Sequence, residues 1–143
     1  MREIERPKNG WNLPREPKTE FTKEELSEIL DLFLQYKPLF DESSTIELDY
    51  DIQKAPDQFT KILYKYNITD RFYNKGIREI RNQYGDLPVR ELSKKKLDFS
   101  EVMTLFTFIH RADHFSFGFY EDCIKDKTYY NLLCRLEEIK NEL

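Results

Sequence analysis

From Leu26 onward, apolar residues recur at the spacing of an α-helix. The first run consists of Leu26, Ile29, Leu30 and Phe33. It follows Thr22-Lys23-Glu24-Glu25, a capping box in which the threonine and the last glutamate can each bond the backbone amide of the other. Phe21 precedes the cap and fits a hydrophobic staple with Leu26. The pattern predicts a first helix that starts after Thr22 and is closed by Lys37-Pro38.

The next segment, 39–55, is typical of a loop, with a short apolar alternation at 45–50 that suits an extended piece. Pro56 suits the first turn of a second helix, because proline has no N–H to contribute there. The apolar face of this helix consists of Phe59, Ile62, Leu63 and Tyr66. Asn67 fits the left-handed residue that commonly follows a helix.

A third helix is expected over 74–84, and the most apolar segment of the chain follows it at 98–112. The inward face of the third helix consists of Ile77, Ile80 and Tyr84, with Gly85 as its stop. In the 98–112 segment, apolar residues cover most of the helix circumference, which is typical of the central helix of a small bundle. Asp98 or Ser100 can cap it.

Two more helices are expected, a short one near 117–125 and a last one after Thr128. The apolar stripe of the last helix consists of Leu132, Leu133, Leu136 and Ile139. The predicted fold is therefore all-α, a compact bundle of five or six helices over 21–143, with one short extended segment allowed near 45–50. Residues 1–20 contain several prolines and few apolar residues, and they are expected to form an extended arm.

Composition supports this picture and adds a candidate anchor in the arm. Of the 143 residues, 39% are hydrophobic and 15% aromatic, which is enough apolar side chain to exclude a disordered chain. The single tryptophan, Trp11, either pins the arm to the domain or forms an exposed anchor for a partner. No apolar stretch is long enough to span a membrane, and Cys123 and Cys134 fit apolar stripes as reduced thiols. A cytoplasmic location is expected.

Both histidines lie in the densest polar cluster, 110–114. His110 and His114 share a helix face at i and i+4 and can bind a divalent metal, but no glutamate follows the first histidine as in metalloproteases. Hydrogen-bonded histidines are the favoured interpretation, since a third ligand can only be guessed. The four glycines are scattered, and no nucleophile elbow is present. We predict no metal, no cofactor and no catalytic residues.

A basic stripe at helical spacing is formed by Arg71, Lys75, Arg78 and Arg81. Aromatic residues are interleaved with it, and Lys94, Lys95 and Lys96 lie downstream. Such a stripe can grip phosphates and stack bases. The net charge of −4 and the pI of about 5.3 oppose this, because an acidic surface repels phosphate backbones unless charge is locally segregated. A solvated helix face is the competing interpretation.

Two stretches resemble a family of small bacterial proteins that is classed as a domain of unknown function. The stronger is C-terminal: an apolar helix runs into Arg111-Ala112-Asp113-His114-Phe115-Ser116-Phe117-Gly118, and Leu133-Cys134-Arg135-Leu136 follows after Asp126-Lys127-Thr128. The weaker stretch runs from Asp49-Tyr50 through Pro56, Phe59 and Leu63-Tyr64 to Arg71-Phe72. This chain departs from the family pattern at His114, which replaces a second arginine, and at Lys127, which replaces a glycine.

The residues of the C-terminal motif are expected to hold the last three helices together. Arg111 would complement the dipole at the end of the 98–112 helix, Phe115 would pack back, and Gly118 would allow a close turn. Arg135 would meet a carboxylate such as Asp113 or Glu121. A structural lock is favoured over a binding site for this motif.

Three functions follow from these patterns. The leading hypothesis is a non-enzymatic helical protein-interaction or regulatory domain of bacterial or phage origin, with a protein partner or self-association. The second is a nucleic-acid-binding module that uses the stripe at 71–81. The third is an enzyme or metal-binding protein centred on His110, Arg111 and His114.

Overall fold

Helices make up all the regular secondary structure in residues 20–41, 50–69, 73–115 and 118–143, which are the residues that the computed structural model describes. In these ranges the helices are α1 (Lys23–Leu34), α2 (Lys37–Asp41), α3 (Tyr50–Lys65), α4 (Tyr73–Tyr84), α5 (Val89–Leu92), α6 (Phe99–Phe115), α7 (Phe119–Lys125) and α8 (Thr128–Asn141). The all-α prediction is confirmed, and α2 and α5 are short additions to the six longer helices. The predicted arm and most of the 45–50 segment lie outside the described residues.

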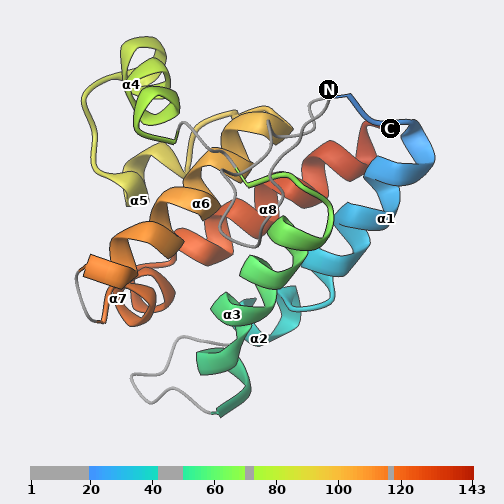
Figure 1. Ribbon diagram of the computed structural model, residues 1–143, viewed down its shortest axis with the longest axis horizontal. Coiled ribbons are helices and arrows are strands. Elements are labelled where there is room, and N and C mark those ends of the chain that lie inside the picture. The colour runs from blue at the N-terminus through green and yellow to red at the C-terminus, as the bar shows by residue number, and fades with distance from the viewer. Residues whose placement is uncertain (1–19, 42–49, 70–72, 116–117) are drawn as a thin grey trace, which may run out of the picture.

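The α6 helix occupies the centre of the bundle, as its apolar circumference predicts. It packs against α3, α4, α7 and α8, and in Figure 1 it runs through the middle of the molecule. Its start is fixed by Asp98: the Asp98 N–H donates to Glu101 Oε1 at 2.9 Å, and the Glu101 N–H donates to Asp98 Oδ1 at 2.8 Å. These two bonds satisfy donors that the helix end would otherwise leave unpaired.

The core is built on a cluster of aromatic rings from five helices. Phe59 of α3 lies at its centre, with ring centroids 5.2 Å from Phe106 of α6, 5.4 Å from Tyr129 of α8 and 5.6 Å from Phe33 of α1. Phe40 of α2 lies 6.0 Å from the same ring. Burial raises the pKa of the Tyr129 hydroxyl well above its usual range. The interior therefore depends on rings that stack across helices.

Predictions based on local capping and turn residues hold well. In α1, the Glu25 N–H donates to Thr22 Oγ1 at 3.0 Å and the Thr22 N–H donates to Glu25 Oε1 at 2.9 Å, as the capping box requires. Asn67 has a φ of 55° after α3, where the Ile68 N–H donates to the Leu63 carbonyl at 2.9 Å. The third predicted helix corresponds to α4, which ends at Tyr84 and is followed by Gly85 with a φ of 116°.

Two predicted helix boundaries are wrong. Lys37-Pro38 does not close α1, which ends at Leu34, but opens α2. The α3 helix begins at Tyr50 instead of near Pro56, so Tyr50 is helical and Pro56 lies inside the helix. Proline in a helix interior removes a hydrogen bond and crowds the preceding turn. Because α3 continues through Pro56, it buries apolar side chains both before and after the proline, namely Ile52, Ala55 and Phe59.

None of the helices within the described ranges is long and apolar enough to cross a membrane.

Candidate interaction surface

Arg111 contacts an aromatic ring of a neighbouring helix. It is exposed on α6, and its Cζ lies 5.9 Å from the ring centroid of Tyr73 at the start of α4. A guanidinium over an aromatic face at an exposed site stabilises by about 0.5–1 kcal/mol. Of the other residues in this part of the predicted motif, the side chains of His114 and Phe115 lie outside the described set. Arg111 therefore connects α6 to α4 at the surface.

Arg135 is the buried member of the motif, with only 8% of its surface exposed. Its Nε–H donates to the Leu97 carbonyl at 2.6 Å, and its Nη1 donates to Glu138 Oε1 at 2.9 Å. The guanidinium thus holds the segment before α6 against α8. A buried charge needs such partners, because its desolvation is costly otherwise.

Arg135 does meet a carboxylate, but it is Glu138 and neither of the two that were named, Asp113 and Glu121. Asp113 Oδ1 accepts a hydrogen bond from the Tyr120 N–H at 2.9 Å, at the start of α7. Glu121 pairs with Lys125 at 2.8 Å on the surface of the same helix. Arg135 points toward the segment between α5 and α6, and the sequence pattern does not show which face of α8 meets that segment.

Two residues with positive φ flank α7. Gly118 precedes the helix with a φ of 93°, which confirms the predicted turn. Lys127 follows the helix with a φ of 73°, and its N–H donates to the Ile124 carbonyl at 3.3 Å. This is the left-handed position after a helix that glycine usually occupies. Lys127 therefore occupies a position where the backbone favours glycine.

We expect Lys127→Gly to be more stable than Lys127→Ala by about 1 kcal/mol, because an L-residue in the left-handed region costs about 1–2 kcal/mol. Both variants lose the contact of Lys127 Nζ with the Tyr130 ring, at 5.5 Å, so the comparison isolates the backbone. Urea unfolding followed by circular dichroism measures the difference. If residue 127 had ordinary helical backbone angles, the alanine variant would be the more stable one, by about 0.5–1 kcal/mol. A more stable alanine variant would therefore contradict the left-handed conformation.

His110 lies in a hydrogen-bonded cluster at the junction of α3, α6 and α7. Its Nδ1 lies 2.6 Å from Tyr120 Oη and 3.3 Å from Thr60 Oγ1. Burial raises the pKa of Tyr120, and the charges of Asp113 and Asp57 raise it further. Within the described part of the chain, no three His, Cys, Asp or Glu side chains are grouped to hold a metal ion. The contacts of His110 agree with the interpretation of a hydrogen-bonded histidine.

The two cysteines occupy different environments. Cys123 is buried on α7, where burial raises the pKa of its thiol to about 12, with the charges of Asp126 and Asp122 adding to the effect. A thiol with so high a pKa has very little thiolate near neutral pH and is a poor nucleophile. Cys134 is half-buried on α8. The burial of Cys123 agrees with its predicted role as a core thiol.

The predicted basic stripe is divided by the structure. Lys75 and Arg78 are exposed on α4, whereas Arg81 is half-buried and donates from Nε to the Leu87 carbonyl at 3.1 Å. Arg71 lies outside the described residues. The opposite face of α4 buries Ile77 and Ile80, and the helix packs against α6.

A wider basic region surrounds the stripe. Residues 73–97 contain seven Lys or Arg and three Asp or Glu, a net charge of +4, whereas the whole chain carries −4. We call this segment, which comprises α4, α5 and their connections, the basic edge. Figure 1 shows α4 at one end of the molecule and α1 at the opposite end. A count of charge in windows along the sequence would have revealed the full extent of this region.

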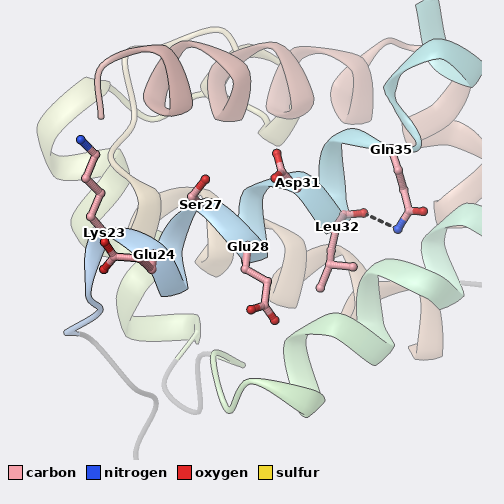
Figure 2. A pocket seen from close by; sticks show the side chains of 7 residues that line it. All are labelled: Lys23, Glu24, Ser27, Glu28, Asp31, Leu32 and Gln35. Carbon is pink, nitrogen blue, oxygen red and sulfur yellow. Dashed lines mark hydrogen bonds between the residues drawn. The ribbon is translucent and has the colours of Figure 1, made fainter.

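The outer face of α1 forms a shallow acidic groove that was not predicted from the sequence. Its volume is about 680 Å³, and it is lined by Lys23, Glu24, Ser27, Glu28, Asp31, Leu32 and Gln35. Figure 2 shows Glu28 and Leu32 pointing to one side of α1, and Ser27 and Asp31 to the other. Two of the acids contact other parts of the chain: Glu28 accepts from Tyr66 Oη, just after α3, at 2.6 Å, and Asp31 pairs with Lys140 of α8. The hydrogen bond to Glu28 raises the pKa of Tyr66.

No family model, no curated protein and no solved structure matches this chain. The resemblance of the C-terminal motif to a bacterial family of unknown function stays a prediction.

Proposed function

We propose that this chain is a non-enzymatic protein-interaction domain that binds an acidic protein partner through its basic edge. The observation that supports this most is the separation of charge, with +4 concentrated in residues 73–97 of a chain whose net charge is −4. Such a surface attracts an acidic partner locally, although the molecule as a whole is acidic. The resemblance noted above supports a bacterial origin.

The arrangement of α4 suits docking. Lys75 and Arg78 are one turn apart on its exposed face, while Ile77 and Ile80 anchor the other face in the core. Arg111 of α6, which is exposed and lies beside Tyr73, adds a third basic group near the start of α4. Because α4 is already folded before binding, association does not carry the entropic cost of folding it. Complementary charge then favours fast association and selects against basic partners.

The test is retention of partners from an extract of the source cells by the immobilised protein. We expect the wild type to retain a protein that about 300 mM salt releases, because salt screens exposed charges. The double variant Lys75→Glu and Arg78→Glu should retain at least about tenfold less of it. The matched control, Lys23→Glu and Lys61→Glu, changes the net charge equally at exposed sites on α1 and α3. Equal loss in the control, or no retained protein, would overturn the proposal.

A second candidate function is binding of single-stranded nucleic acid at the same edge. It is favoured by Tyr73, whose ring lies beside Arg111 at the start of the helix that carries Lys75 and Arg78, because basic and aromatic groups together can bind phosphates and stack bases. Nuclease treatment of the extract distinguishes the two functions: a protein partner survives it. Direct binding of an oligonucleotide at about 50 mM salt, weakening steeply as salt rises, would support the second function instead.

A further inference from the structure

The turn between α5 and α6 carries three consecutive lysines and is held from two other helices. The Lys96 carbonyl accepts from Tyr84 Oη of α4 at 2.9 Å. The Leu97 carbonyl accepts from Arg135 Nε of α8 at 2.6 Å, and Ser93 Oγ accepts from Asn131 Nδ2 of α8 at 3.1 Å. These bonds reach across 12 to 38 positions in sequence and fix the backbone that presents Lys94, Lys95 and Lys96.

Positive charge exceeds negative charge among the side chains that line this turn, where four cationic groups and two carboxylates lie. Lys94 Nζ lies 3.3 Å from Glu91 Oε2, and the Arg135 guanidinium pairs with Glu138. In the described part of the chain, Lys95 and Lys96 have no carboxylate within ion-pair distance. Like charges on consecutive residues repel each other, and an anion placed between them reduces that repulsion.

The lysines face a groove that can hold such an anion. Its volume is about 600 Å³, and it is lined by Lys94, Lys95, Lys96, Arg135, Glu138, Asn141 and Glu142. The Arg135 guanidinium lies at the buried side of this groove. Ammonium groups bind phosphate oxygens as point charges, and the carboxamide of Asn141 can add a neutral donor. Two acids, Glu138 and Glu142, also line the groove and oppose an anion. Glu138 pairs with Arg135, whereas Glu142 has no cationic partner among the described residues.

We propose that the Lys94–Lys96 turn is a binding site for a phosphate-bearing anion. The site lies within the basic edge, but it uses Lys95 and Lys96, whereas the proposed protein contact is tested at Lys75 and Arg78 on α4. The phosphate belongs either to a small polyphosphate or to the backbone of a nucleic acid. Both sources present the same chemistry to the lysines.

The test is titration with inorganic pyrophosphate at about 50 mM salt, followed by calorimetry and by nuclear magnetic resonance of the backbone amides. We expect saturable binding with a Kd below about 1 mM and shifts centred on residues 93–97. Lys95→Gln with Lys96→Gln should weaken binding at least tenfold. Glu142→Gln should tighten it several-fold, since it removes the opposing charge. The control pair, Lys23→Gln with Lys61→Gln, should leave the Kd unchanged.

The source of the phosphate is decided by competition. Displacement of pyrophosphate by a short oligothymidylate, dependent on Lys95 and Lys96, assigns the site to a nucleic-acid backbone; failure of the oligonucleotide to displace it assigns the site to small polyphosphates. The proposal is overturned if pyrophosphate binding is not saturable, if it is unchanged in the Lys95 and Lys96 variant, or if sulfate at equal concentration binds equally well. None of these outcomes depends on Lys75 or Arg78, so this site and the proposed protein contact fail independently.

Discussion

Replacing Phe59 with alanine is expected to lower the free energy of unfolding by about 3–5 kcal/mol, the cost of removing a large buried ring. Phe59 is 2% exposed, and its ring lies within 6.0 Å of four other rings that are also buried. A fifth ring, Tyr36, meets it edge-on at 5.5 Å. Removal of the ring leaves a cavity at the point where α1, α2, α3, α6 and α8 meet, so several helices lose packing at once.

The matched control for Phe59→Ala lies on the same helix. Tyr64 is 58% exposed, and we expect Tyr64→Ala to cost less than about 1 kcal/mol, because surface substitutions rarely cost more. Phe59→Leu, which keeps most of the volume, should cost less than Phe59→Ala. Urea unfolding monitored by circular dichroism gives all three values. Similar costs for Phe59→Ala and Tyr64→Ala would contradict a core centred on Phe59.

Features governed by nearby residues were predictable from the sequence. The capping box at Thr22 and Glu25 and the left-handed Asn67 each depend on bonds between residues that are at most five positions apart. The central position of α6 was also predictable, because a helix that is apolar nearly all round has to be buried on all sides. Local chemistry and periodicity were sufficient in these cases.

Features that depend on packing between distant residues were not predictable. Pro56 marks a helix start by local rules, but the burial of Ile52 and Ala55 against other helices continues α3 through it. Arg135 was identified as a motif residue, yet one of its two partners, the Leu97 carbonyl, lies 38 positions away. A backbone carbonyl has no residue-type signal, so a search of the sequence for carboxylate partners could not find it.

The candidate surfaces follow the same division. The exposed positions of Lys75 and Arg78 follow from the periodicity of α4, whose opposite face holds Ile77 and Ile80. The half-buried position of Arg81 does not follow from this periodicity, because it depends on the fold of the segment after Gly85. The lysine turn was visible in the sequence as a charge run, but only the structure shows that it is fixed by donors from α4 and α8.

Replacing Arg135 with alanine is expected to lower the free energy of unfolding by about 2–4 kcal/mol. The change removes a hydrogen bond from a charged donor and leaves the buried Leu97 carbonyl without it, and each of these losses costs about 1–3 kcal/mol. Glu138, the other partner, is largely exposed and can return to water at little cost. The loss therefore reflects mainly the contact with the segment before α6.

Arg111→Ala tests whether the two arginines of the motif play the same role. The Arg111 contact with Tyr73 is at the surface, and its loss should cost no more than about 1 kcal/mol. Equal costs for Arg135→Ala and Arg111→Ala would contradict the inference that the buried arginine stabilises the fold more than the exposed one. Arg135→Lys keeps the charge but not the planar guanidinium that reaches Leu97 and Glu138 together, so it should recover only part of the lost stability. Full recovery by lysine would show that charge, and not hydrogen-bond geometry, holds the turn.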